Sequence, residues 1–525
     1  MDAQDNEWPV DTWTVTKPAV TGAKGGLVAS QHPLASDVGA AVLRAGGNAV
    51  DAAVSAGLAI GTVEPWMSGL GGGCQLLVYR AKENKAYVVD AGMLAPKQLD
   101  PADYPLAGGT GADLFAWPSV QDNRNVEGYH AIAVPGYVDG VALALERFGT
   151  IGWKDAIAPA IESARNGMAV DWYATLKIAS GAAVLAKFPA STDAYLPGGH
   201  VPSGEWGGPI PRITLGNLAD TLQRLSDAGP RDYYEGEIAK SLVADLNAGG
   251  SRMSAEDLAN YKAAVVEAGT MRYRDATVFT APGLTAGPSL QMALRLLSEK
   301  LSPGGAPDAA AFDAYAQALL QTYADRLETM GDADESKAPS CTTHLSVVDK
   351  DGNFVALTQT LLSLFGSKVM LPGTGVTMNN GIMWFDPRPG RANSIRPGAR
   401  PLSNMCPTFF HRDDGLQVAL GASGGRRIFP ALFQLISFLV DYRMNLNDAA
   451  HHGRIDVSGT ETVLADHALG EAVIADLAAK YQTTVVQNGV FPALFACPNL
   501  AAREANGSFS GAAYIPSPWS KVSPA

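Results

Sequence analysis

The sequence predicts an α/β (α+β) fold in which β-sheets are covered by layers of helices. Alanine-rich helical segments dominate residues 137–331, β-rich runs begin at residue 342, and an apolar helical segment covers 428–441. Helices that precede and follow strands bury their apolar stripes against a sheet. The chain has 525 residues, 47% hydrophobic and 17% charged, so it can enclose a large core.

The N-terminal elements follow from turn and capping residues. Gly46-Gly47 is typical of a helix end, and Pro33 of a helix start. The expected order is an irregular lead-in over 1–25, a buried strand over 26–30, a helix from 33 to the glycine pair, a second helix from about 51, and a strand over 75–80 after the glycine cluster 69–73.

The middle of the chain reads as mainly helical. Two stretches rich in small and polar residues, 189–212 and 331–340, predict surface loops. The expected helical segments are 137–180, 215–247, 254–264, 289–300 and 308–331.

A β-hairpin is predicted after residue 341. Two β-rich runs, 342–348 and 354–360, flank Asp351-Gly352, and Asp-Gly between such runs is a strong hairpin signal. Further strands are expected over 374–379, 406–411 and 416–421, ahead of the helix over 428–441.

Composition and charge exclude several classes of partner. The net charge is −13 and basic residues are scattered, so we expect no nucleic acid partner. No run approaches eighteen apolar residues, which argues against a membrane partner. The acidic first residues lack the basic start and apolar stretch of a signal peptide, which predicts a cytoplasmic protein. The four cysteines lie far apart without metal-ligand spacing, so we expect neither a disulfide framework nor a metal site.

The segment Ser340-Cys341-Thr342-Thr343-His344 carries the chemistry of greatest interest. A threonine hydroxyl is a poor nucleophile until a base takes its proton. Cleavage of the peptide bond before Thr342 creates an α-amino group that can act as this base. The alternative interpretation is an ordinary edge strand with a solvent-facing threonine.

Landmarks across residues 26–456 favour the catalytic interpretation. They are Ser30-Gln31-His32-Pro33-Leu34-Ala35, Gly46-Gly47-Asn48-Ala49-Val50-Asp51-Ala52-Ala53, Glu64-Pro65, Ser68-Gly69-Leu70-Gly71-Gly72-Gly73, Val134-Pro135-Gly136, Tyr234-Glu235-Gly236-Glu237-Ile238-Ala239, Tyr323-Ala324-Asp325-Arg326, Phe365-Gly366, Asn379-Asn380, Arg400-Pro401-Leu402-Ser403 and Gly424-Gly425. Together with the segment around Thr342, these landmarks and their order resemble the γ-glutamyltransferase family of N-terminal-nucleophile hydrolases.

The resemblance implies a four-layer αββα sandwich and a set of catalytic roles. Self-cleavage after Cys341 would make Thr342 the nucleophile, with the Thr360 hydroxyl assisting it. Gly424 and Gly425 would supply backbone N–H groups to the oxyanion, although a tight turn before the next helix is an alternative role. The fragments 1–341 and 342–525 would stay together in one globule, and no metal or organic cofactor would be needed.

The positions that bind substrate in the family depart from its pattern. A buried charge without a partner costs several kcal/mol, so their replacement disfavours a γ-glutamyl zwitterion. We therefore expect a small-molecule amide substrate whose acyl group is at least partly apolar or aromatic. Gly92 stands in place of an arginine, Leu362 of an asparagine, Gly381 of a glutamine, Trp384 of an aspartate and Asn404 of a serine, while Ser403 is kept.

Other polar residues are weaker candidates. Arg396 and Arg426 could bind a carboxylate or serve only as surface charge and loop anchors. Because side chains alternate along a strand and the nucleophile carries its own amine, we interpret His344 as structural. His451-His452 has no third ligand at helical spacing, so it does not predict a metal site.

Two alternatives to the altered amidohydrolase remain. One is a true γ-glutamyltransferase or glutathione hydrolase whose recognition residues are rebuilt elsewhere. The other is an uncleaved, inactive homologue that only binds a ligand or partner. The sequence leaves open the acyl group, the choice of water or an amine as acceptor, and whether the protein forms a homo-oligomer.

Overall fold

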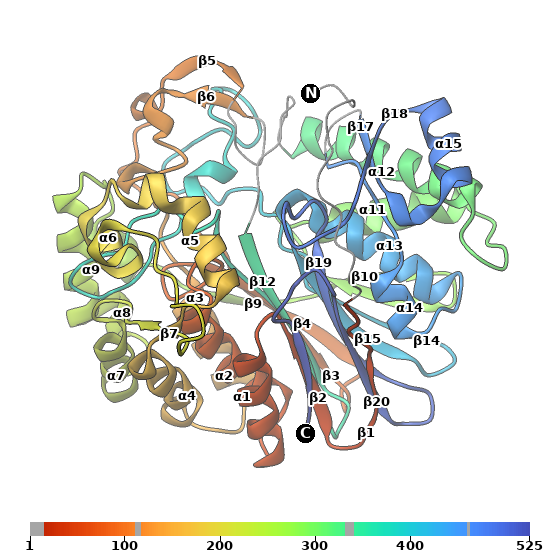
Figure 1. Ribbon diagram of the computed structural model, residues 1–525, viewed down its shortest axis with the longest axis horizontal. Helices are drawn as coiled ribbons and strands as arrows, with labels where there is room; N and C mark the ends of the chain where they lie inside the picture. Colours follow the sequence, from red (N-terminus) through yellow and green to blue (C-terminus); the bar gives the residue numbers. More distant parts are fainter. Residues whose placement is uncertain (1–14, 111–116, 331–340, 459–461) are drawn as a thin grey trace.

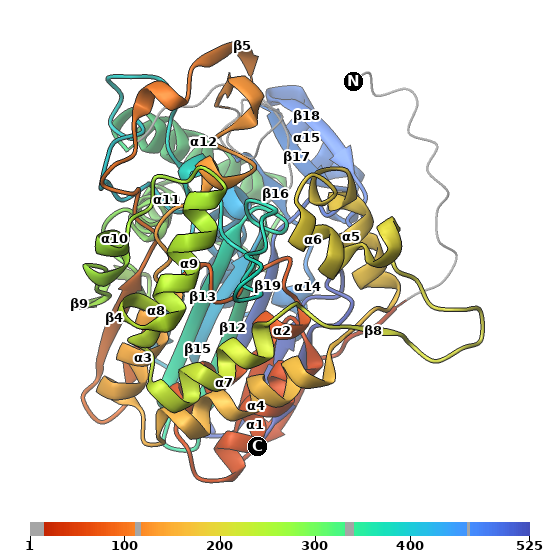
Figure 2. The same ribbon diagram turned by 90° about the vertical axis from the view of Figure 1, so that its left-hand side faces the viewer.

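The computed structural model describes residues 15–110, 117–330, 341–458 and 462–525. Two seven-stranded antiparallel sheets lie face to face at the centre, and helices cover both outer faces (Figure 1). The turned view in Figure 2 shows the helices of the N-terminal half on one side of the sheets. The predicted four-layer αββα sandwich is therefore confirmed.

The first sheet contains the predicted hairpin at its centre. Its turn is closed by a hydrogen bond from Gly352 N to Asp349 O (3.0 Å), and the Asp349 carboxylate accepts bonds from the N–H groups of Asp351 and Asn353. The strand order is β21 (Lys521–Pro524), β2 (Gly26–Ser30), β12 (Cys341–Asp349), β13 (Phe354–Leu362), β3 (Gly73–Arg80), β4 (Lys85–Ala91) and β9 (Ala264–Glu267).

The second sheet packs against the first through an aromatic layer. The rings of Tyr79 and Phe409 stack with centroids 4.2 Å apart, and Phe279 and Phe354 pack around them. The strand order is β1 (Val20–Ala23), β20 (Phe509–Ala513), β19 (Cys497–Arg503), β15 (Gln417–Ser423), β14 (Thr408–Arg412), β11 (Ala276–Thr280) and β10 (Gly269–Tyr273).

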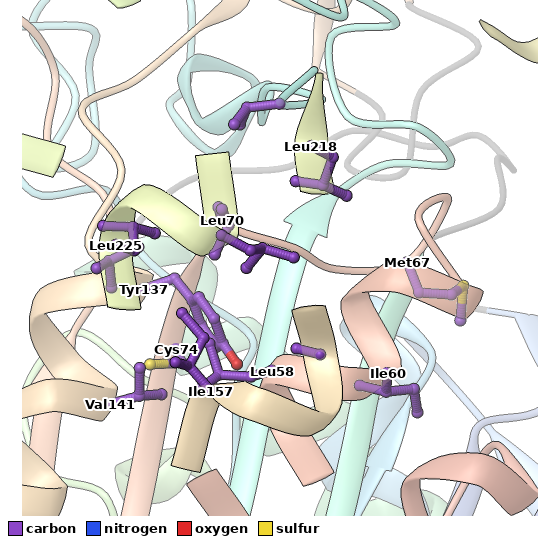
Figure 3. Packing of buried hydrophobic residues seen from close by; sticks show 14 of the residues in the cluster. Leu58, Ile60, Met67, Leu70, Cys74, Tyr137, Val141, Ile157, Leu218 and Leu225 are labelled. Carbon is purple, nitrogen blue, oxygen red and sulfur yellow. The ribbon is translucent and has the colours of Figure 1, made fainter. Parts of the chain in front are cut away.

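Helices of the N-terminal half cover the outer face of the first sheet. Figure 3 shows how Leu58, Tyr137, Ile157 and Leu225 from different helices interlock there. These helices are α1 (Pro33–Arg44), α2 (Ala49–Val63), α3 (Tyr137–Phe148), α4 (Trp153–Asn166), α5 (Trp172–Leu185), α6 (Pro189–Tyr195), α7 (Leu218–Ala228), α8 (Asp232–Glu235), α9 (Glu237–Ala248) and α10 (Ala255–Ala259).

The outer face of the second sheet has its own helical layer. The apolar helix α13 (Ile428–Val440) is buried along its whole length. Its companions are α11 (Gly287–Lys300), α12 (Ala309–Thr329), α14 (Leu446–His451) and α15 (Glu471–Lys480), with a small sheet of β16 (Ile455–Asp456), β17 (Thr462–Asp466) and β18 (Gln482–Val486).

Each large sheet combines strands from before and after residue 342. In the first sheet β2 pairs with both β12 and β21, so residues from the two ends of the chain lie in neighbouring strands. In the second sheet β11 pairs with β14. Peptide-bond cleavage before residue 342 would leave both halves held by these ladders.

Several predicted boundaries are wrong. The expected lead-in contains β1, the expected loop over 189–212 contains α6, and the expected helix over 254–264 ends at Ala259. The expected strand over 374–379 forms only isolated bridges, such as Met370 with Thr377. The expected loop over 331–340 lies outside the described residues. Within the described part of the chain, no helix combines the length and apolarity needed to cross a bilayer.

Candidate active site

The two threonines of the predicted site meet at one end of the central hairpin. The Thr342 hydroxyl on β12 donates to the Thr360 hydroxyl on β13 across 3.3 Å. The pairing of β12 with β13 shifts register between Cys341 and Thr343, where three steps along β13 oppose two steps along β12. Both threonines are buried, with 4% and 1% of their surface exposed.

Side-chain alternation along β12 points Thr342 and His344 toward the second sheet. The His344 ring bonds to the hydroxyls of Thr358 (2.9 Å) and Ser346 (3.0 Å). Burial lowers the pKa of His344 to about 3, so the ring is neutral at physiological pH. These contacts confirm the structural interpretation of His344.

Backbone geometry makes glycine necessary at residue 424. Gly424 has φ +142° and Gly425 has φ +59°, both in the region that side chains disfavour. A Cβ at residue 424 would also lie 2.8 Å from the Cα and Cβ of Ala496. The pair connects the end of β15 to a short 3₁₀ turn and then α13, so the predicted tight turn is present.

A glutamine bridge links strand β12 to the glycine pair. Gln31 Oε1 accepts a hydrogen bond from His344 N (3.0 Å), and Gln31 Nε2 donates to Ser423 Oγ (2.7 Å). Ser423 immediately precedes Gly424. Asn499 adds a second tie, because its Nδ2 donates to His344 O (3.2 Å). Thr342 and Gly424 therefore each lie within two residues, along the chain, of a hydrogen-bond partner of Gln31.

Sequence reasoning missed the role of Gln31. Its only signal is its place in the Ser30–Ala35 landmark. Its partners lie on strands of two different sheets, which no local pattern relates.

Three of the predicted substrate-binding residues line one small pocket. Gly92, Trp384 and Ser403 border it together with Arg400 and Gln75. This pocket lies at the same end of the sandwich as Thr342 and Thr360, because Thr360 pairs with Gly73 and the residue after Gly73, Cys74, pairs with Ala91.

Leu362 and Trp384 belong to a buried apolar cluster rather than to a polar recognition site. The cluster also contains Met93, Ile382 and Met405. The backbone of Leu362 adopts φ +85°, and its N–H donates to Thr360 Oγ1 (2.8 Å). Leu362 therefore holds the Thr360 hydroxyl through its main chain, whichever group its side chain contacts.

Residue 381 has no room for a side chain. A Cβ on Gly381 would lie 2.7 Å from both Met93 Sδ and Ala133 Cβ. Real Cβ atoms do not approach this closely, so a glutamine at this position would force its neighbours to move.

Buried Arg326 positions the segment of Ser403 and Asn404. Its Nη2 donates to Ser403 O (2.9 Å) and to Asn404 Oδ1 (3.2 Å). Because the Asn404 oxygen is occupied, its Nδ2 is the group left without a partner among the described residues. Desolvation lowers the pKa of Arg326 to about 10, which leaves the guanidinium charged at neutral pH.

The weaker candidates differ in their surroundings, and Arg426 directly follows the glycine pair. Arg396 is exposed and bonds to Ala392 O, whereas buried Arg426 lies over the Trp117 ring. The rings of His451 and His452 bond to different backbone carbonyls. Among the residues that the structure describes, no group of three or more His, Cys, Asp or Glu side chains is arranged to hold a metal ion.

Comparisons with known proteins agree with this architecture. The family described as Gamma-glutamyltranspeptidase matches residues 35–341 and 335–496. The Acylase ACY 1 proenzyme of Pseudomonas sp. (strain V22) is 32% identical over 96% of this chain and 94% of its own length. The Glutathione hydrolase proenzyme of Bacillus subtilis (strain 168) is 29% identical over 93% and 90%.

A solved structure shows the same fold. The cephalosporin acylase from Bacillus halodurans superposes with a TM-score of 0.85 over 99% of both chains at 22% identity. The family match and the relatives, which are enzymes, lead to one conclusion: this chain is an enzyme of the gamma-glutamyltranspeptidase family.

Proposed function

We propose that the protein is a self-processing amidohydrolase in which Thr342 is the nucleophile and Thr360 assists it. The observation that carries this proposal is the 3.3 Å contact between their buried hydroxyls at the end of the central hairpin. Two relatives are named proenzymes, which supports maturation by cleavage. The proposed products are residues 1–341, ending in Cys341, and 342–525, held together by the shared sheets.

The proposed chemistry follows from the freed N-terminus. The α-amine of Thr342 accepts the hydroxyl proton while Oγ1 forms a bond to the amide carbonyl carbon. Backbone N–H groups of Gly424 and Gly425 stabilise the resulting oxyanion. The C–N bond then breaks, and the leaving amine takes the proton. Water attacks the threonine ester and releases the carboxylic acid, although an amine acceptor in place of water would give acyl transfer.

The acyl group is proposed to be other than a γ-glutamyl zwitterion. Leu362 and Trp384 are buried in an apolar cluster, and Gly381 leaves no space for a recognition side chain. An ammonium group placed beside this cluster would lose hydration without gaining a partner. The names of two similar proteins, an acylase and a cephalosporin acylase, support amides of other acids as substrates.

Intact mass and a denaturing gel test the proposed nucleophile. We expect the wild-type protein to give two fragments that divide between Cys341 and Thr342, and Thr342→Ala to remain one polypeptide without amidase activity. An unbroken chain that still hydrolyses amides would overturn the proposal. An unbroken and inactive chain would favour the binding-protein alternative.

A second assay separates the proposal from glutathione hydrolase activity, which the Bacillus subtilis relative brings into question. Matured enzyme is compared on γ-glutamyl-p-nitroanilide and on anilides of apolar acids. We expect higher kcat/KM on the apolar series. Efficient turnover of the γ-glutamyl compound at low concentration would contradict the assigned roles of Gly92, Gly381 and Trp384.

A further inference from the structure

We propose that a cavity beside the first residues of α1 and α5 and the last residue of α2 binds a small apolar α-amino acid. The cavity has a volume of about 80 Å³ and is bordered by His32, Leu34, Val63, Trp66, Ala169, Asp171, Arg212 and Trp519. None of these residues is assigned to the catalytic site, so the inference goes beyond the proposed function and does not depend on Thr342.

The size of the cavity suits a molecule of a few heavy atoms. Because one water molecule needs about 10–15 Å³ of such volume, the cavity provides roughly six positions of this size. A small amino acid such as alanine has about this many non-hydrogen atoms. Leu34, Val63 and the ring of Trp66 supply apolar walls against which its side chain can pack.

Two opposite charges border the cavity from the same small sheet. Strand β7 (Met168–Ala169) pairs with β8 (Arg212–Ile213), and Ala169 lies opposite Arg212. Asp171 follows two residues after Ala169. Among the described residues, no ion pair joins Asp171 to Arg212, although both side chains border the cavity. An α-amino acid carries an ammonium and a carboxylate group and therefore complements both charges.

Both charged side chains keep hydrogen-bonding capacity for this ligand. Arg212 Nη1 donates to Gly167 O (2.7 Å), which leaves Nε and Nη2, and two parallel N–H groups of a guanidinium match a carboxylate. Asp171 Oδ1 accepts from Tyr173 N (2.9 Å) and Ala174 N (3.0 Å), which leaves Oδ2 for an ammonium group. Arg212 is exposed, so a ligand can reach the cavity from its side.

The other polar groups at the cavity are N–H donors. His32 Nδ1 accepts from Leu34 N (3.2 Å), and burial lowers the pKa of His32 to about 4, so the neutral ring carries its proton on Nε2. The Nε1 atoms of Trp66 and Trp519 are buried without a partner in the described part of the chain. Buried donors without a partner are rare, and a wall rich in them favours a ligand that offers carboxylate oxygens.

Three matched ligands test the inference by isothermal titration calorimetry of the wild-type protein. L-alanine carries both charges, propionate lacks the ammonium group, and ethylamine lacks the carboxylate. We expect alanine to bind at least about tenfold more tightly than either of the others, because each of them leaves one charged side chain without its partner. Equal binding of the three compounds, or absence of alanine binding, would overturn the inference.

Two variants identify the charges that bind the ligand. Asp171→Asn keeps a side-chain oxygen that can cap α5 but removes the negative charge. It should weaken alanine binding about tenfold and leave propionate binding unchanged. Arg212→Met should weaken alanine binding about tenfold and leave ethylamine binding unchanged. Arg165→Met, which removes an exposed arginine of α4 that bonds to Gln223, is the control and should bind all three compounds as the wild type does.

The selective losses separate ligand binding from disruption of the cavity. A variant that weakens all three compounds has lost the cavity itself, and Trp519→Phe then takes its place. This variant deletes one N–H donor and keeps both charges, so it should weaken alanine and propionate but leave ethylamine unchanged. Unchanged alanine affinity in Asp171→Asn and Arg212→Met would put the ligand elsewhere and overturn the inference. Amide hydrolysis takes no part in these titrations, so their failure leaves the proposed function of Thr342 untouched.

Discussion

Removal of the Gln31 amide gives the sharpest test of how the catalytic site is assembled. Gln31→Met keeps the length of the side chain but deletes both of its polar ends. The structure assigns the Gln31 amide two bonds, one from His344 N (3.0 Å) and one to Ser423 Oγ (2.7 Å). The variant therefore breaks a link between the nucleophile strand and the segment that enters the glycine pair.

The expected cost follows from these two bonds. His344 is fully buried, so its N–H loses its partner without gaining water, which costs about 1–3 kcal/mol. Loss of the bond to Ser423 adds about 1 kcal/mol, for a total of about 2–4 kcal/mol. Misplacement of a nucleophile by about 1 Å can slow catalysis by about a hundredfold. We therefore expect self-cleavage and amide turnover to slow by about tenfold to a hundredfold.

Gln434 provides a matched control. It is another fully buried glutamine, and its amide bonds to Ile455 N and to the carbonyls of Pro430 and Ile455. Thermal denaturation should show similar losses for Gln31→Met and Gln434→Met. The rate of self-cleavage, followed by quenched time courses, and the rate of amide hydrolysis, from steady-state kinetics, should fall only for Gln31→Met. Equal rates in the two variants would refute the assigned coupling between the sheets.

Three other changes have expected outcomes. Gly381→Gln should lower the free energy of unfolding by about 1–3 kcal/mol through overpacking against Met93, which denaturation would measure. Steady-state kinetics should show that this variant gains no turnover of γ-glutamyl substrates. Burial lowers the pKa of His344 to about 3 from 6.5, so the unfolded chain binds a proton that the folded chain excludes. Stability should consequently fall as pH decreases from 6.5 toward 3, and His344→Gln should flatten that part of a pH–denaturation profile. Burial raises the pKa of Glu64 to about 8 from 4.5, so the folded chain holds a proton that the unfolded chain has lost. The stability that Glu64 contributes should decline as pH rises from 4.5 to 8, and Glu64→Gln should remove this pH dependence of the free energy of unfolding. An unchanged pH dependence in the His344 or Glu64 variant would contradict the pKa shift assigned to that residue.

Local signals predicted the elements that carry the proposed nucleophile. The Asp351-Gly352 turn and the β-rich runs around it correctly gave the hairpin of β12 and β13. The alternation of side-chain direction along a strand also predicted an inward-facing His344, and its ring bonds to neighbouring hydroxyls inside the sandwich. Helix α1 begins at Pro33 and ends before the glycine pair, as its capping residues predicted. These features depend on residues close together in the chain.

Features that depend on distant residues were not predictable in the same way. The run 374–379 has strand-like composition, but the Asn379 side chain bonds to the Gly71 and Ala133 carbonyls in place of a continuous ladder. The hydrogen bond from Arg400 to the Gly92 carbonyl likewise joins residues 308 positions apart in the chain. Neither a hydrophobic period nor a turn signal encodes such contacts.

The site separates chemistry from recognition because different parts of the fold hold each. Thr342 and Thr360 depend on strand pairing, and Gly424 depends on a backbone conformation at the end of a strand. Residues proposed for recognition, such as Trp384, lie instead on connections between strands, where side chains can change without disturbing a ladder. Under the proposed function, an exchange of charged groups for apolar ones there would alter the acyl group that fits while leaving the hydroxyl pair intact. Gln31 joins the two sheets and so belongs with the residues that hold the proposed catalytic groups. Substitution of Gln31 should therefore slow the turnover of every substrate to the same degree.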